Sequence, residues 1–126
     1  MANDYPGAEP FFGNCSATPD GTTAGYGQIG PVPANKRLVV ESVSVSLNTS
    51  TSGSIYVMAL GVSGGGFSLN LIPTFVGDGP DGVRRFCATH VIRFYVESGQ
   101  SLEFDVSTVG AAGAAVCSVS GYYLDT

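Results

Sequence analysis

The single histidine, His90, is the residue on which any Ser–His–Asp or Cys–His mechanism in this chain would depend. It lies between Ala88 and Ile92 on the apolar parity of an alternating stretch, which is typical of a histidine in a core or an interface. We identify neither a G-x-S-x-G elbow nor a cysteine in a recognised protease context to accompany it. We therefore expect His90 to have no catalytic role.

Glu103 and Asp105 form a second candidate site, because residues two apart on a strand point to the same face. Two carboxylates about 5–10 Å apart can divide the acid and base roles of a glycosidase. Here they alternate with apolar residues over 102–106, and such alternation is typical of a strand with one face in water. We expect a solvated face, with cross-strand pairing to Arg93 or Arg85, and no catalysis.

Asp78 and Asp81, in the run GDGPDG, are a weak candidate for a calcium site, because their oxygens could serve as ligands. The run lacks the alternating ligands and the terminal glutamate of an EF-hand loop. Asp–Gly pairs also form turns readily, because both residues tolerate left-handed backbone angles. We expect a turn over residues 76–82 and no cofactor.

Three cysteines, Cys15, Cys87 and Cys117, have neither the spacing of a zinc site nor a CxxC motif. The favoured interpretation is free thiols that are buried as small hydrophobic side chains. The alternative is one intrachain disulfide and one free thiol, and the sequence does not select the pair.

The composition is unusual in its low content of charged residues. Asp, Glu, Lys and Arg together make up 12% of the 126 residues, against about 25% in an average soluble protein. A surface of small neutral polar groups opposes association weakly, so this composition favours a subunit that lies against other subunits.

The net charge of −5 and the absence of a basic cluster argue against partners that carry phosphate. We expect no nucleic-acid binding and no binding to anionic membranes. No stretch approaches the roughly 18 apolar residues of a membrane span. Residues 1–10 contain neither the basic region nor the apolar region of a signal peptide. The compartment remains open, with a virion or an extracellular location favoured.

Alternating apolar residues predict strands over most of the chain from residue 36 onward. Residues 43–47 alternate valine or leucine with serine, and a change of parity upstream predicts a bulge or a twist near Val40 and Glu41. Further strands are expected over 67–71, 86–96, 102–106 and 115–124. No stretch has helical periodicity, and we expect roughly six to eight strands in a sandwich or barrel.

Residues 1–35 contain five of the seven prolines and scattered aromatic residues, including Phe11 and Phe12. We predict that this segment is a loop-like N-terminal arm and that residues 36–126 form the sandwich domain. The aromatic side chains of the arm then need a surface to cover, either on their own domain or on a neighbour.

Residues 55–62 are apolar on both parities, which predicts a strand covered on both faces. In a two-layer sandwich the second cover must be the N-terminal arm, a loop or another subunit. Tyrosine is enriched at interfaces because it combines a large ring with a hydrogen-bonding group. The predicted interface residues are Phe11, Phe12, Tyr56, Met58, Leu60, Tyr95, Tyr122 and Tyr123.

These observations predict an all-β antiparallel sandwich of jelly-roll type, with an immunoglobulin-like sandwich as the alternative. We expect a non-enzymatic structural subunit that assembles with copies of itself or with other structural proteins. It could belong to a virion shell, decoration or fibre, or be an extracellular structural protein. The alternative is a small module that binds carbohydrate through the loops at one end of the sandwich.

Overall fold

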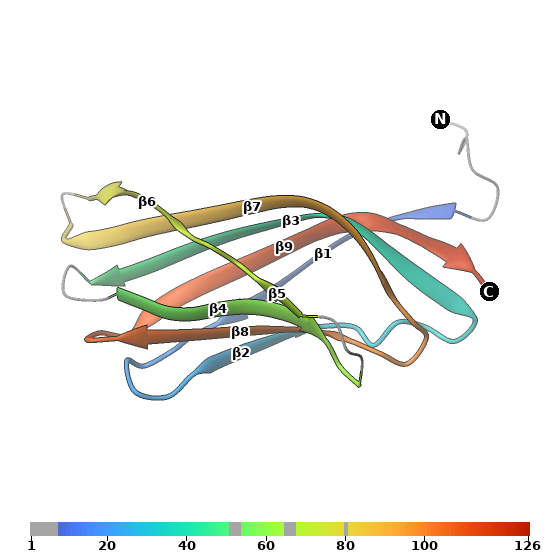
Figure 1. The fold of residues 1–126 in the computed structure, drawn as a ribbon, viewed down its shortest axis with the longest axis horizontal. Helices are drawn as coiled ribbons and strands as arrows, with labels where there is room; N and C mark the ends of the chain where they lie inside the picture. Colours follow the sequence, from blue (N-terminus) through green and yellow to red (C-terminus); the bar gives the residue numbers. More distant parts are fainter. Residues whose placement is uncertain (1–7, 51–53, 65–67, 80) are drawn as a thin grey trace.

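The structure is a computed structural model in which residues 8–50, 54–64, 68–79 and 81–126 are described. These residues form nine strands and no helix. The strands are β1 (Ala8–Ala17), β2 (Gly25–Ile29), β3 (Lys36–Ser50), β4 (Ser54–Val62), β5 (Ser68–Asn70), β6 (Thr74–Asp78), β7 (Val83–Val96), β8 (Leu102–Val109) and β9 (Gly113–Asp125). They form two antiparallel sheets in a sandwich-like arrangement, as the sequence predicts at this level (Figure 1).

The larger sheet has five strands in the order β1-β9-β3-β7-β6, and the smaller has four in the order β2-β8-β4-β5. The first strand therefore pairs with the last, the second with the eighth and the third with the seventh. Among the described strands, only two pairings join strands that are consecutive in the sequence, and these are β4 with β5 and β6 with β7. The first and the last strand consequently lie side by side.

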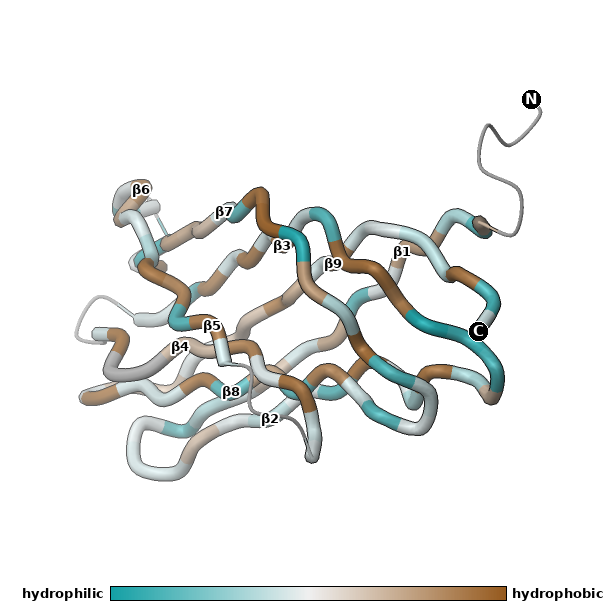
Figure 2. Tube along the Cα trace, turned by 45° about the vertical axis from the view of Figure 1, so that its right-hand side comes forward, coloured by the Kyte–Doolittle hydropathy of each residue, from teal (hydrophilic) through white to brown (hydrophobic). Residues whose placement is uncertain are grey.

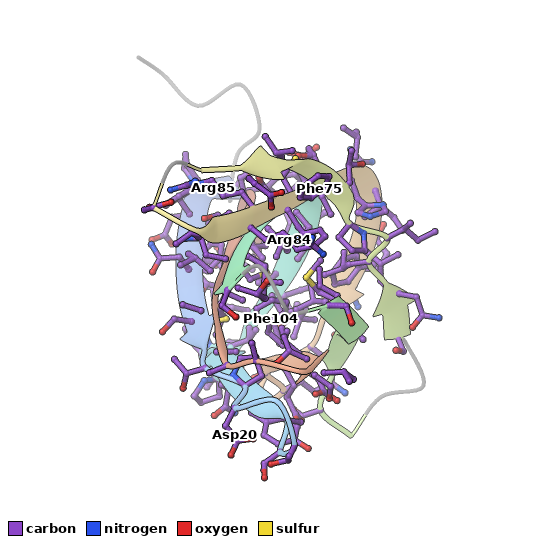
Figure 3. All side chains as sticks on the ribbon, turned by 90° about the vertical axis from the view of Figure 1, so that its left-hand side faces the viewer. Asp20, Phe75, Arg84, Arg85 and Phe104 are labelled. Carbon is purple, nitrogen blue, oxygen red and sulfur yellow. The ribbon has the colours of Figure 1, made fainter. Side chains whose placement is uncertain are left out.

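The core lies between the two sheets and is built by alternation. In β3 the side chains of Val43, Val45 and Leu47 point inward, and the serines between them point out. Phe104 of β8 is fully buried near the middle of this core (Figure 3). Hydrophobic positions recur along the strands between more hydrophilic ones (Figure 2), as expected for strands with one buried face.

The bulge predicted near Val40 and Glu41 is confirmed. The pairing of β3 shifts between Val40 and Ser42 against both β7 and β9. Because the bulge adds one residue, the side chains of Leu38 and Val40 before it point into the core, as those of Val43 and Val45 do after it. Val39 then points away from the core.

The prediction of a loop-like arm is wrong for residues 8–17 and 25–29, which form β1 and β2. β1 and β2 are edge strands. The backbone N–H and C=O groups along one side of each strand therefore need no hydrogen-bond partner in the sheet. An edge strand tolerates a proline such as Pro10 for the same reason. The part of the predicted arm in residues 1–7 lies outside the described residues.

The apolar side chains of β4 also differ from the prediction. Met58 and Leu60, expected at an interface, are buried in the core between the two sheets of the same chain. On the opposite parity β4 presents the small residues Ala59 and Gly61 at the outer face of the four-stranded sheet. The side chain of Tyr56 lies outside the described part of the structure.

Candidate functional site

Four residues that point away from the core form one row across the five-stranded sheet. Pro10 of β1 opposes Tyr122 of β9, Tyr122 opposes Val39 of β3, and Val39 opposes Tyr95 of β7. Val39 is 1% exposed although it is not part of the core between the sheets. We attribute this burial to its two flanking tyrosines, which makes a small hydrophobic cluster on the outside of the sandwich.

The next row continues this cluster. Phe12 opposes Ser120, Ser120 opposes Ser42, and Ser42 opposes Val91. The hydroxyls of Ser42 and Ser120 are hydrogen-bonded to each other at the centre of the row. At its two ends Phe12 is 70% exposed and Val91 is 90% exposed. We call the apolar residues of the two rows the outer-face patch: Pro10, Phe12, Val39, Val91, Tyr95 and Tyr122.

The two rows beyond the patch contain no charged residue. One consists of Asn14, Ser118, Ser44 and Thr89, and the other of Ser16, Val116, Ser46 and Cys87. These short side chains cover the middle of the outer face with hydroxyls, an amide, a thiol and one exposed valine. These two rows are therefore uncharged across four neighbouring strands. Within the patch itself, the ion pair Arg93–Glu41 lies beside Val91.

The cations of the chain are all neutralised by carboxylates on or beside the same sheet. The pairs are Lys36–Asp125 at 2.6 Å, Arg37–Glu97 at 2.8 Å, Arg84–Asp78 at 3.4 Å, Arg85–Asp81 at 3.2 Å and Arg93–Glu41 at 3.2 Å. The hydrogen bond to Asp125 raises the pKa of Lys36. Exposed ion pairs of this kind add little stability. Their effect here is to leave the five-stranded sheet almost without net charge.

The predicted interface residues divide between the two sides of this sheet. Phe12, Tyr95 and Tyr122 come together on the outer face, as part of the patch. Phe11 and Tyr123 instead pack against the core, with their rings in edge-to-face contact at 5.1 Å between centroids. Tyr122 and Tyr123 thus point to opposite faces of β9, as consecutive residues of a strand are expected to do.

Sequence reasoning missed the other members of the patch. Val39 was not identified, because its outward direction depends on where the bulge falls. Val91 shares the parity of Thr89 and Arg93, and this signal identifies it as an exposed valine on a polar face. Pro10 lay in the segment interpreted as a loop.

The predicted catalytic and metal candidates lie elsewhere. His90 is half-buried on the inward parity of β7, opposite Val43. Asp78 and Asp81 each form an ion pair with an arginine, and Asp81 also accepts a hydrogen bond from the Val83 backbone N–H in the β6–β7 turn. Among the described residues no group of three or more His, Cys, Asp or Glu side chains could hold a metal ion.

Glu103 and Asp105 share one face of β8, as predicted, and that face is the outer side of the four-stranded sheet. The predicted pairing with Arg93 or Arg85 is wrong. Both arginines are on β7 in the other sheet, where they bind Glu41 and Asp81.

The expectation that the chain has no G-x-S-x-G pattern needs a correction, because residues 61–65 read GVSGG and match this pattern of a serine nucleophile. That pattern requires a strand that turns directly into a helix, whereas Ser63 lies between strands β4 and β5. Its Oγ accepts a hydrogen bond of 2.8 Å from the Ser101 backbone N–H. Ser63 therefore links two loops of the sandwich.

No family model matches the chain, and neither a curated protein nor a solved structure shows significant similarity to it. The described part of the chain has no helix with the length and hydrophobicity needed to cross a bilayer.

Proposed function

We propose that this chain is a non-enzymatic structural subunit that assembles with copies of itself through the outer-face patch. The observation that carries the proposal is the combination of exposed apolar side chains and missing net charge on one broad face. Aromatic residues and depleted charge distinguish the centre of protein interfaces from the rest of a surface. Phe12, Tyr95 and Tyr122 supply the aromatic residues here.

The distribution of charge favours a second copy as the occupant. The chain carries a net charge of −5, so two copies repel unless they meet through a neutral surface. The outer face of the five-stranded sheet is such a surface, because its cations and carboxylates are paired within the chain. A two-fold contact through this face places the patch of one copy on the patch of the other.

We further propose that the sandwich is of jelly-roll type. The pairing β1·β9, β2·β8, β3·β7 and β4·β5 supports this, because it is the order of a long hairpin rolled into two sheets. β6 is then an additional edge strand beside β7. Jelly rolls form viral capsid and lectin domains, which agrees with a component of a virion shell, decoration or fibre, or an extracellular structural protein.

The proposal is tested by placing a charge within the contact. Val91→Glu puts a carboxylate on the outer-face patch without removing a core contact, because Val91 is almost fully exposed. Burying this unpaired charge weakens self-association by about a hundredfold or more. The matched control is Ile72→Glu, which makes the same kind of change at an exposed position between β5 and β6. Sedimentation velocity that finds equal association in both variants contradicts the proposal.

A further inference from the structure

The outer face of the four-stranded sheet carries an acidic groove. One hollow of about 340 Å³ is lined by Tyr26, Gly27, Gln28 and Glu103. A second, of about 250 Å³, is lined by Tyr26, Ala59, Gly61, Val62, Ser68, Glu103 and Asp105. Because both hollows share Tyr26 and Glu103, we treat them as one groove, which runs from β2 across β8 to β4 and β5.

The strand register explains the shape of the groove. On one side, β2 places Tyr26 opposite Asp105 and Gln28 opposite Glu103. On the other side, β4 places Ala59 opposite Asp105 and Gly61 opposite Glu103. The small residues of β4 leave space beside the carboxylates, while Tyr26, 70% exposed, presents its ring on the β2 side. A flat ligand can therefore lie between the tyrosine and β4.

The two carboxylates of the groove differ from those of the other sheet in their partners. Within the described residues neither Glu103 nor Asp105 forms an ion pair, in contrast to the carboxylates of the other sheet. Asp105 Oδ1 is buried and has no hydrogen-bond partner in that part of the chain. A buried acceptor without a donor is costly, so a ligand that donates hydrogen bonds is favoured at this position.

We propose that this groove binds a neutral glycan. A sugar ring has an apolar C–H face that can stack on Tyr26 and hydroxyls that can donate to Glu103 and Asp105. Gln28 offers both a donor and an acceptor at the same edge. An acidic sugar is repelled by the two carboxylates, and a bound calcium ion requires more oxygen ligands than two carboxylates supply. The proposal concerns the sheet that the assembly contact leaves free, so it does not depend on that contact.

The test is a titration of the isotope-labelled protein with neutral oligosaccharides of glucose, xylose, mannose and galactose, followed by amide chemical shifts. The expected result is that at least one of them shifts the amide signals of β2 and β8 in a saturable way. Tyr26→Ala should weaken this binding by about tenfold through loss of ring stacking. Glu103→Gln should also weaken it, because the amide keeps the size of the side chain but not its charge. Tyr95→Ala, which removes an exposed tyrosine from the other sheet, should bind as the original chain does.

Three outcomes overturn the proposal. The first is that none of the oligosaccharides shifts the signals of β2 and β8. The second is that Tyr26→Ala and Glu103→Gln bind as tightly as Tyr95→Ala, which places the sugar elsewhere. The third is that calcium chloride alone gives the same saturable shifts, which makes the groove a cation site. If Tyr26→Ala does not fold, Gln28→Ala replaces it. Val91→Glu should lose self-association but still bind the sugar. This variant therefore distinguishes a loss of self-association from a loss of glycan binding in the groove.

Discussion

Cys15 of β1 lies directly opposite Cys117 of β9, so the two thiols are neighbours and interact. This contact lowers the pKa of Cys15, and together with burial it raises the pKa of Cys117. Both thiols are free, as is the exposed Cys87 on β7. The chain thus places two of its three cysteines side by side on its first and last strands.

The first prediction is that Cys15 and Cys117 form a disulfide when the folded protein is treated with oxidised glutathione. Opposed residues of antiparallel strands have Cα atoms about 4.5–5.5 Å apart, within the range of a disulfide. The two thiols lose two electrons and two protons, and glutathione disulfide is reduced to two glutathione molecules. Because the bond closes a long loop, the free energy of unfolding should rise by about 4 kcal/mol.

Intact mass and chemical denaturation measure this change. Cys87→Ser should oxidise in the same way, whereas Cys117→Ser should show no gain in stability. A disulfide that includes Cys87 instead would contradict the contact.

The second prediction concerns Asp20 in the turn between β1 and β2, at one tip of the molecule (Figure 3). Its carboxylate accepts hydrogen bonds from the backbone N–H groups of Thr22 and Thr23 and from the Thr22 hydroxyl. The backbone hydrogen bonds lower the pKa of Asp20 from its ordinary value of 3.8. Since the folded pKa lies below the unfolded one, the stabilisation is present well above pH 3.8 and is lost as the pH falls through the folded pKa.

Asp20→Asn should therefore be less stable than the original chain at neutral pH, and the difference should vanish in acid. A titration of the Asp20 carboxyl carbon by NMR checks the sign directly. A measured pKa above 3.8 contradicts the turn geometry.

The third prediction is that Phe104→Ala lowers the free energy of unfolding by about 3–5 kcal/mol, because it leaves a cavity in the core. Phe104 is fully buried between the two sheets. Phe104→Leu should cost clearly less, since it retains most of the buried volume. Denaturant unfolding of both variants measures the difference. An equal loss of unfolding free energy in both variants would contradict this prediction, because it would mean that the core closes around the vacated site.

Local patterns in the sequence predict the central strands well. The alternation of Val43, Val45 and Leu47 with serine and the parity change near Val40 define β3 and its bulge, because both depend only on neighbouring residues. The edge strands were missed for a physical reason. Edge strands need fewer ladder bonds, so β1 and β2 can contain the glycines and the proline that indicate loops elsewhere.

The candidate surfaces depend on register, which a single sequence does not contain. The pairing of β3 with β7 and with β9 places Tyr95, Val39 and Tyr122 in one row. These strands are far apart in the chain, so the row is not visible in the sequence. The shared face of Glu103 and Asp105 was predicted from their spacing alone. Tyr26 could not be placed beside them, because the groove exists only once β2 pairs with β8.

The central claim, that this chain associates with copies of itself, is tested most directly by its molar mass in solution. Light scattering behind a sizing column, over a range of protein concentrations, gives this mass without reference to shape. The account predicts a mass that is a multiple of the 12.9 kDa of one chain and that falls towards it on dilution or in Val91→Glu. A mass of 12.9 kDa at every concentration would contradict self-association through the outer-face patch.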